Sequence, residues 1–291
     1  MTMRRTLIAF LTAASLVAAG ALAQSPGRTE RPATVSYGSD KAQQLDLYRA
    51  RSTAGPAPLI LFVHGGGWTN GSKDNATGRH MAPHYTALGY HFATIDYRLV
   101  PGATVEQQAQ DVADALKHLL GRVGPLGIDP GKVVLMGHSA GAHLVALVGA
   151  DPQYLRRAGL SYEDVDGIIP LDGAAYDVAE QMKQSRLPLL KRRYDAAFGK
   201  DPARQRALSP INHAADPNAA NWLILHVDRV DGRQQSQDLA RALRRAGAEA
   251  ELRNFEGKGM KGHMEINRRL GDPDYPATPV VDRWLARVFG S

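Results

Sequence analysis

The chain has 291 residues, with 35 Lys and Arg against 29 Asp and Glu, and it contains no cysteine. This length suffices for one large domain, so a second domain is not required. The absence of cysteine excludes disulfides, thiolate catalysis and zinc-thiolate sites, so burial of apolar side chains must hold the fold together. Basic residues are concentrated between Lys183 and Arg206, but aromatics do not interleave them in the way that single-strand nucleic-acid grooves use, so we expect a solvated face there and no nucleic-acid groove.

The first 23 residues have the pattern of a secretory signal peptide. A basic start is followed by the apolar run Leu7–Ala19 and by small residues that end at Ala23. The run is shorter than the roughly 18 apolar residues that a membrane span needs. We therefore expect cleavage before Gln24, export to the periplasm or the medium, and no stable membrane insertion afterwards.

The remaining chain is expected to form a flexible leader, residues 24–34, and a single domain, residues 35–291. Short aliphatic runs alternate there with stretches of helical period, which is typical of strand–helix–strand units and a mostly parallel sheet with helices on both faces. The leader is polar with two prolines and has little to bury. The expected strands are Leu59–Val63, Phe92–Ile95, Val133–Met136, Ile168–Leu171, Leu223–Val227 and Ala250–Phe255.

Three helices are predicted between these strands. The first is opened by a capping box at Thr104 and Gln107, buries apolar residues from Val105 to Leu119, and is closed by Gly121. The others are expected over 233–246 and from Thr278-Pro279 to Val288. Residues 172–221 lack strand signals and contain four prolines, so we expect a mostly helical insert that shapes a substrate pocket.

The segment Gly-His-Ser-Ala-Gly at residues 137–141 has the context of a nucleophile elbow. It follows an apolar strand directly and leads into a helix-forming run. A sharp strand-to-helix turn leaves no room for side chains at Gly137 and Gly141, and it exposes the hydroxyl of Ser139. Ser139 is therefore the candidate nucleophile.

A run of three glycines follows the first expected aliphatic strand, in the segment His-Gly-Gly-Gly-Trp at residues 64–68. Such a loop exposes backbone N–H groups, and donors held in place can each stabilise a developing oxyanion by about 2.7 to 4 kcal/mol. We expect the amides of Gly66, Gly67 and Ala140 to form an oxyanion hole. His64 is interpreted as structural, because it precedes every candidate acid.

The general base is predicted from the order of the triad in α/β-hydrolases, which is serine, acid, histidine. Of the ten histidines, His263 fits this order, and we expect it in a glycine-rich loop after the last strand. The acid is assigned to Asp228, which follows the strand Leu223–Val227 at once. Asp231 and then Glu256 remain alternatives.

Other histidines are given structural interpretations. His80 and His84 have the i, i+4 spacing of a metal pair, but neither an adjacent glutamate nor a third ligand accompanies them. His138 and His143 flank the elbow and are expected to pack or to line the pocket. No metal and no cofactor are expected.

The chain resembles the hormone-sensitive-lipase-type and feruloyl or acetylxylan esterase-like α/β-hydrolases, with kynurenine formamidase as a relative. Three segments carry this resemblance: the glycine run at residues 64–68, Asp-Tyr-Arg-Leu at residues 96–99 and the elbow at residues 137–141. The resemblance implies that Asp96 and Arg98 support the oxyanion loop. It departs at the acid, because relatives show His-Gly-x-x-Asp where this chain has His-Val-Asp at 226–228. Candidate pocket side chains are Trp68, His138, Asp172 and Tyr176.

The expected function is hydrolysis of a small carboxylic ester through an acyl-enzyme formed on Ser139. One alternative is an arylformamidase or amidase that uses the same groups, because esters and activated amides pass through the same tetrahedral intermediate. Another is an inactive binding protein of the same fold. The acyl and alcohol specificity and the oligomeric state cannot be read from these residues, since fold does not fix substrate.

Overall fold

The computed structural model describes residues 32–290, apart from residues 52, 75–78, 186–187 and 216. The predicted signal peptide and nearly all of the predicted leader lie outside this range. One eight-stranded sheet runs through the described chain, in the order β1-β2-β4-β3-β5-β6-β7-β8. The strands are β1 (Ala33–Ser36), β2 (Gln44–Tyr48), β3 (Ala57–Val63), β4 (His91–Ile95), β5 (Ile128–His138), β6 (Gly167–Leu171), β7 (Asn221–Asp228) and β8 (Glu249–Lys258).

All six predicted strands are present, in β3 to β8, and they pair in parallel. Successive side chains of these strands enter opposite cores, as the period of two requires. In β3, for example, Leu59 and Leu61 belong to one apolar cluster, whereas Ile60 and Phe62 belong to the other. Both faces of β3 to β7 are therefore covered, which is why these strands are largely aliphatic, whereas β8 at the edge of the sheet carries exposed polar side chains such as Arg253 and Asn254.

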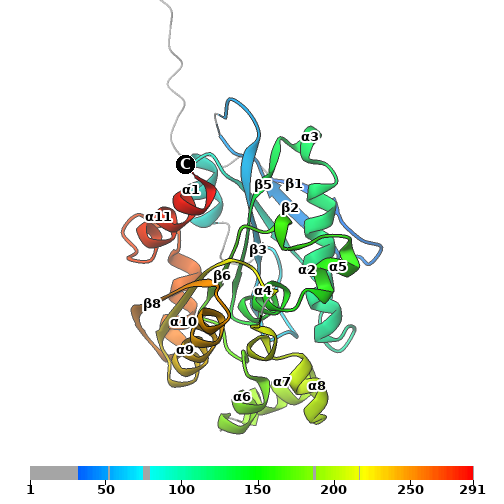
Figure 1. Ribbon diagram of the computed structural model, residues 1–291, viewed down its shortest axis with the longest axis vertical. Coiled ribbons are helices and arrows are strands. Elements are labelled where there is room, and N and C mark those ends of the chain that lie inside the picture. Colours follow the sequence, from blue (N-terminus) through cyan, green and yellow to red (C-terminus); the bar gives the residue numbers. More distant parts are fainter. Residues whose placement is uncertain (1–31, 52, 75–78, 186–187, 216, 291) are drawn as a thin grey trace, which may run out of the picture.

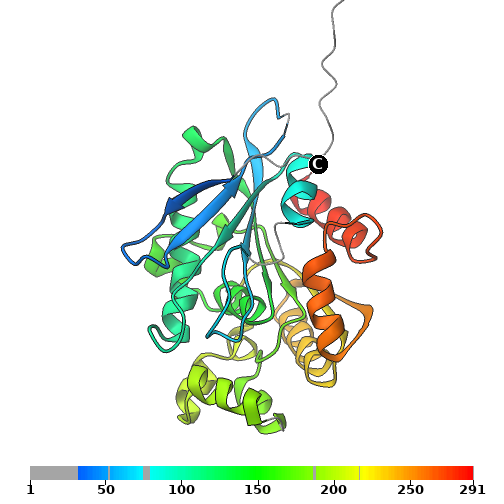
Figure 2. The same cartoon turned by 180° about the vertical axis from the view of Figure 1, so that it is seen from behind.

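Helices cover the two faces of the sheet, as Figures 1 and 2 show for α1 and α11 on one side and α2 and α5 on the other. Apolar residues of α2, α4, α5 and α9 pack in the first cluster, and those of α1, α10 and α11 pack in the second. The helices are α1 (Met81–Ala87), α2 (Val105–Leu120), α3 (Val123–Leu126), α4 (Ala140–Ala150), α5 (Gln153–Ala158), α9 (Val230–Arg245), α10 (Gly259–Arg269) and α11 (Thr278–Phe289).

The predicted helix ends are close to the observed ones. The capping box of Thr104 and Gln107 is present at the start of α2, and Gly121 is its C-cap. The helix expected from residue 233 begins earlier, at Val230. Thr278 lies inside the first turn of α11, after the N-cap Ala277, rather than serving as the cap itself.

Two parts of the architecture differ from the prediction. The N-terminal strands β1 and β2 form an antiparallel edge of the sheet, and β1 includes Ala33 and Thr34 of the expected leader. β1 is short and largely exposed and pairs with β2, which itself pairs with β4, and neither strand has a continuous aliphatic run. The expected glycine-rich loop after β8 is instead the helix α10.

The segment expected to be a helical insert contains α6 (Val178–Gln184), α7 (Pro188–Phe198), α8 (Pro202–Ala207) and the short 3-10 helix η3 (Pro210–His213). Figure 1 shows α6, α7 and α8 together at one end of the molecule. Tyr194 and Phe198 of α7 are buried against Trp68, which follows β3. This contact fixes the insert over the end of the sheet where β3 and β5 finish.

Within the described ranges, the structure has no helix that combines the length and the apolar character needed to cross a bilayer.

Trp222 of β7 joins the sheet to α4. Its side chain is fully buried, its Nε1–H donates to the Ala219 carbonyl at 2.6 Å, and its ring lies 2.9 Å from where a Cβ on Gly149 would stand. Replacing Trp222 by alanine should lower the free energy of unfolding by about 3 to 5 kcal/mol, because it leaves a large cavity. Urea unfolding would measure this loss. Leu88→Ala, at a side chain that is 46% exposed, should change stability by less than about 0.5 kcal/mol; equal effects would contradict the assigned packing.

Candidate active site

Ser139 occupies a strained turn between a strand and a helix. β5 ends at His138 and α4 begins at Ala140, and Ser139 between them has φ of +58°. A Cβ on Gly137 would lie 2.4 Å from the carbonyl oxygen of Gly141, and a Cβ on Gly141 would lie 2.1 Å from that of Val63. Only glycine fits at positions 137 and 141, as the sequence predicted. A strained backbone such as that of Ser139 is typical of functional positions.

His263 lies beside Ser139, although its backbone is helical rather than a loop. The hydroxyl of Ser139 is 3.0 Å from Nε2 of His263, in the orientation for donation to that nitrogen. His263 is 5% exposed and lies in the second turn of α10. Gly257 and Gly259, both with positive φ, turn the chain from β8 into α10, and a Cβ on Gly262 would lie 2.5 Å from the carbonyl carbon of Gly257. The glycines that suggested a loop therefore allow a tight strand-to-helix junction.

The carboxylate that contacts His263 belongs to Asp172. Nδ1 of His263 donates to Oδ2 of Asp172 at 2.6 Å, and the backbone N–H of Val227 donates to Oδ1 at 3.1 Å. Asp172 directly follows β6, is fully buried and has φ of +44°. The sequence placed this residue in the pocket, but not against the imidazole.

The assignment of the acid to Asp228 is therefore wrong. Asp228 is the last residue of β7, its side chain is 48% exposed, and it pairs with Arg233 at 3.3 Å. Of the alternatives, Asp231 pairs with Arg229 at 3.5 Å, and Glu256 is exposed on β8. The order serine, acid, histidine is satisfied by both Asp172 and Asp228, so order could not separate them. Both also follow an aliphatic strand directly, so position after a strand did not separate them either.

Arg229 is a site residue that the sequence did not reveal. Its Nε lies 2.9 Å from the same Oδ2 of Asp172 that His263 contacts, and its Nη2 donates to the carbonyls of Asp172 and Gly173 at 3.2 and 3.3 Å. The side chain is only 13% exposed. The contact through Nε is an ion pair rather than a hydrogen bond.

The electrostatics of this cluster keep Asp172 ionised. Burial alone would raise the pKa of Asp172, but the hydrogen bond from His263, the positive charge of Arg229 and the amide of Val227 together lower it below its usual value. A charged carboxylate at this position holds the imidazole in the tautomer with hydrogen on Nδ1. Nε2 is then free to accept from Ser139.

The neighbouring histidines are neutral supports. Burial lowers the pKa of His138 to about 3 and that of His143 to about 4. Nε2 of His138 donates to the carbonyl of His263 at 2.8 Å, and its ring lies 4.5 Å from that of His263. Nε2 of His143 donates to the Leu208 carbonyl at 2.8 Å, while Trp68 donates to its Nδ1. These contacts agree with the packing and pocket-lining positions expected for both residues.

The glycine loop lies against Ser139. A Cβ on Gly65 would be 2.9 Å from the Cβ of Ser139, and Gly66 and Gly67 have φ of +132° and +62°. The loop is anchored at Trp68, whose carbonyl accepts from the amide of Val100 at 3.0 Å and from the side chain of Gln108 at 2.8 Å. Gly66, Gly67 and Ala140 all line the cavity beside Ser139.

His64, at the start of this loop, is a buried structural residue, as interpreted from the sequence. It stacks on Tyr97 with 4.3 Å between ring centroids, and burial lowers its pKa to about 4. The hydroxyl of Tyr97 donates to the carbonyl of His64 at 3.0 Å. Tyr97 thus gives the loop its direct support from the Asp-Tyr-Arg-Leu segment.

Asp96 and Arg98 support the loop less directly than the resemblance implied. Asp96 accepts from the backbone N–H of Lys73 at 2.6 Å, which fixes the chain beyond the loop. Arg98 pairs with the buried Asp111 of α2 at 2.6 Å. Arg98 therefore ties the segment to α2, and among the described residues it forms no hydrogen bond or ion pair with the glycines of the loop.

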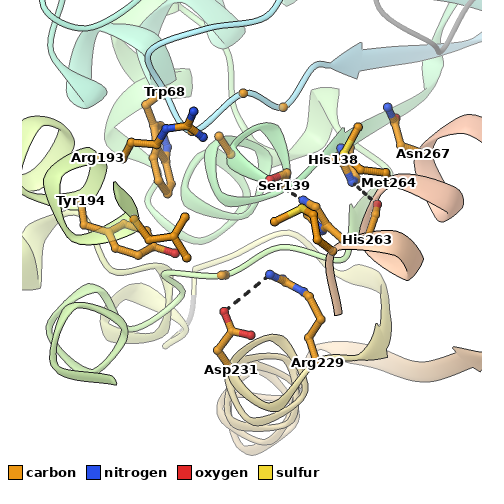
Figure 3. Close-up of a pocket in the computed structure, with 17 residues that line it drawn as sticks. Trp68, His138, Ser139, Arg193, Tyr194, Arg229, Asp231, His263, Met264 and Asn267 are labelled. Carbon is orange, nitrogen blue, oxygen red and sulfur yellow. Dashed lines mark hydrogen bonds and ion pairs between the residues drawn. The ribbon is translucent and has the colours of Figure 1, made fainter. Parts of the chain in front are cut away.

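A cavity of about 250 Å³ opens beside Ser139. Figure 3 shows Trp68, Arg193 and Tyr194 on one side of Ser139, and His138, His263 and Asn267 on the other. Trp68 and His138 line it as predicted, whereas Tyr176 is fully buried and Asp172 lies behind His263. The remaining lining residues come from the glycine loop, the start of α4, the segment after β6, α7, the start of α9 and α10, namely Gly65, Gly66, Gly67, Ala140, Ala174, Leu190, Arg229, Asp231, Met260 and Met264.

The metal pair considered for His80 and His84 does not form a site. Nε2 of His84 lies 2.9 Å from Asp282 of α11, which makes it a structural contact between two helices. Among the described residues, no group of three or more His, Asp and Glu side chains is placed to hold a metal ion.

Residues 45–243 match the family model of BD-FAE. Esterase LipC of Mycobacterium tuberculosis is 32% identical over 206 residues, which cover 67% of this chain and 50% of LipC. Kynurenine formamidase of Danio rerio is 24% identical over 256 residues, which cover 87% of this chain and 81% of that protein. The chain spans about half or less of the length of several other curated relatives that it matches.

The fold is shared with solved esterase structures. A truncated carbohydrate esterase from gut microbiota superposes with a TM-score of 0.74 at 18% identity, covering 92% of this chain and all of the other. At that identity the similarity shows the fold alone. The α/β-hydrolase fold expected from the sequence is thereby confirmed.

The short contact between His263 and Asp172 can be tested without any substrate. A charge-assisted hydrogen bond of 2.6 Å should give an imidazole proton resonance far downfield in the proton NMR spectrum. Asp172→Asn should remove this resonance, because it removes the charged acceptor, whereas Asp228→Asn should leave it in place. If only the Asp228 variant loses the resonance, the acid that contacts His263 is Asp228 at the end of β7 and not Asp172.

Proposed function

This chain belongs to the BD-FAE family, and from that membership and the geometry beside Ser139 we propose that it is a serine hydrolase of small carboxylic esters. The observation that carries the proposal is the continuous hydrogen-bonded chain from Ser139 through His263 to Asp172, at 3.0 and 2.6 Å, beside the cavity. This is the arrangement of a nucleophile, a base and an orienting acid. The esterases among its relatives support the same reaction.

In the proposed mechanism, Oγ of Ser139 attacks the ester carbonyl carbon while Nε2 of His263 takes its proton. The imidazolium then donates that proton to the leaving alcohol oxygen, the carbon–oxygen bond breaks, and the acyl group remains on Ser139. Water enters, His263 takes its proton, and the acid is released as Ser139 regains its hydrogen. The nearby His138 and His143 stay neutral because burial lowers their pKa values, so they do not compete as bases.

The proposed oxyanion hole consists of the amides of Gly66, Gly67 and Ala140. Ala140 is the first residue of α4, so its N–H is one of those left without a partner inside the helix. The positive φ values of Gly66 and Gly67 expose the loop backbone to the cavity. Donors that are already in place cost no reorganisation when charge develops on the carbonyl oxygen.

Asp172 and Arg229 act through His263 in this proposal. Asp172 stabilises the imidazolium that forms during attack, and Arg229 keeps Asp172 charged and correctly placed. Because the acid Asp172 follows β6, the end of β7 does not supply the acid and contributes Arg229 in its place. Arg229 is thus a positioning residue rather than a catalytic one.

Hydrolysis of an N-formyl aryl amide is the second candidate function, favoured by the similarity to kynurenine formamidase over 87% of the chain. The same nucleophile and oxyanion donors would serve it, since both reactions form a tetrahedral intermediate. Comparing kcat/KM for 4-nitrophenyl acetate and for N-formylkynurenine would separate the two. A higher value for the formamide would replace the ester proposal.

We also propose that the protein is exported, on the signal-peptide pattern of residues 1–23. Fusing residues 1–30 to a reporter that is active only outside the cytoplasm tests this. Replacement of Arg4 and Arg5 by glutamate should slow export, and an inactive reporter with the natural segment would contradict the proposal.

Ser139→Ala should lower kcat for 4-nitrophenyl acetate by at least about 10⁴-fold, because the covalent route is lost. The same variant should no longer react with a fluorophosphonate probe. Ser161→Ala, at an exposed serine far from the site in sequence, is the matched control and should keep both properties. Full turnover by the Ser139 variant would contradict the assignment of Ser139 as nucleophile. If the natural protein neither reacts with the probe nor hydrolyses esters, the alternative of an inactive binding protein is favoured.

Arg229→Gln should lower kcat/KM by about ten-fold and shift its acid limb to higher pH by up to about one unit. The positive charge of Arg229 helps to lower the pKa of Asp172, so its removal raises that pKa, and the ionised Asp172 that orients His263 forms only at higher pH. The measurement is the pH profile of kcat/KM.

Arg233→Gln is the matched control for this pH profile. It removes the same charge from the same helix, but Arg233 pairs with the exposed Asp228 rather than with Asp172. An unchanged profile in the Arg229 variant, or an equal shift in both variants, would contradict the positioning role of Arg229.

A further inference from the structure

Arg193 is a pocket cation to which no described residue supplies a counter-charge. It lies on α7, its surface is partly buried, and it lines the cavity beside Ser139. The other pocket arginine, Arg229, pairs with Asp172 and Asp231. No ion pair or hydrogen bond joins the Arg193 guanidinium to any other described residue.

The guanidinium of Arg193 lies next to the proposed oxyanion loop. Its Cδ and Nη1 are 3.4 and 3.6 Å from the position that a Cβ on Gly67 would occupy. Figure 3 shows Arg193 reaching from α7 toward the centre of the pocket, on the side of Trp68 and Tyr194. A group bound by Arg193 would therefore lie close to an ester carbonyl held at Gly66 and Gly67.

The walls around Arg193 offer little to compensate its charge. Trp68 and Tyr194 lie on the same side of the pocket in Figure 3, and Leu190, on the same helix as Arg193, also lines the cavity. The one carboxylate that lines the cavity, Asp231, is already paired with Arg229. A partly buried cation loses hydration that only a partner of opposite charge restores well.

We propose that Arg193 binds a carboxylate of the substrate, so that this protein prefers esters that carry a free acid group. The planar guanidinium matches a carboxylate with two parallel hydrogen bonds. The acid group can belong to the acyl part or to the alcohol part of the ester, since Arg193 stands near the carbonyl that joins them. This inference rests on the proposed ester hydrolysis and specifies its substrate class.

Two pairs of substrates test the inference and distinguish the two sources of the acid group. Monomethyl adipate carries the carboxylate on the acyl side, and 4-acetoxybenzoate carries it on the alcohol side. Each is compared with its neutral amide analogue, adipamic acid methyl ester or 4-acetoxybenzamide. In one of the two pairs, Arg193→Gln should lower kcat/KM for the acid ester by about ten- to a hundred-fold and should change kcat/KM for the matching amide ester by less than about threefold. The pair that responds shows whether the acid group belongs to the acyl or to the alcohol part.

Arg192→Gln is the matched control, because it removes the same charge from an exposed side chain of the same helix. It should change no ratio of acid to amide ester. Arg193→Lys keeps the charge but loses the planar fork, so its ratio should lie between those of the natural protein and of Arg193→Gln. Thermal unfolding of each variant checks that the fold is kept.

The outcomes separate this inference from the proposed function. If Arg193→Gln lowers the acid and amide esters equally, or changes neither, the carboxylate subsite is wrong while ester hydrolysis stands. The same holds if the natural protein hydrolyses 4-nitrophenyl acetate but none of the acid esters. If it hydrolyses none of these esters at all, the proposed function fails first.

Discussion

The hydrogen bond between His263 and the buried carboxylate of Asp172 is the contact on which the rest of the site depends. A charge that is removed from water is tolerated only when partners surround it. Here His263 contributes one partner, the amide of Val227 a second and the guanidinium of Arg229 a third. Because these come from β7, α10 and the N-cap of α9, the carboxylate ties together three neighbouring parts of the fold.

This arrangement explains why the acid can stand after β6. Strands β5, β6, β7 and β8 are successive neighbours in the sheet, and all run parallel. The residues that follow β5, β6 and β7 therefore emerge at the same edge, and a carboxylate after either β6 or β7 is near an imidazole that follows β8. Asp172 takes this place, and Arg229 compensates its charge from the strand end where the sequence resemblance expected the acid.

The insert completes the site on the opposite side of Ser139. Its helix α7 packs on Trp68, which also belongs to the glycine loop, so the wall of the cavity and the proposed oxyanion donors share one support. Through Arg193 the same helix brings an uncompensated charge to the cavity. The proposed chemistry thus depends on the sheet, while the proposed choice of substrate depends on the helices that cover its end.

The sequence by itself determined the features that local chemistry dictates. The glycines at 137 and 141, the glycine run after β3 and the aliphatic strands follow from short-range sterics and periodicity, and the choice of His263 followed from the chain order of the triad. Tertiary structure alone decided which aspartate meets His263, because Asp172 and Asp228 both follow buried strands and differ only in what surrounds them. It also decided that residues 259–269 form a helix and that Arg229 and Arg193 face the site, since such contacts join residues far apart in the chain and leave no local pattern.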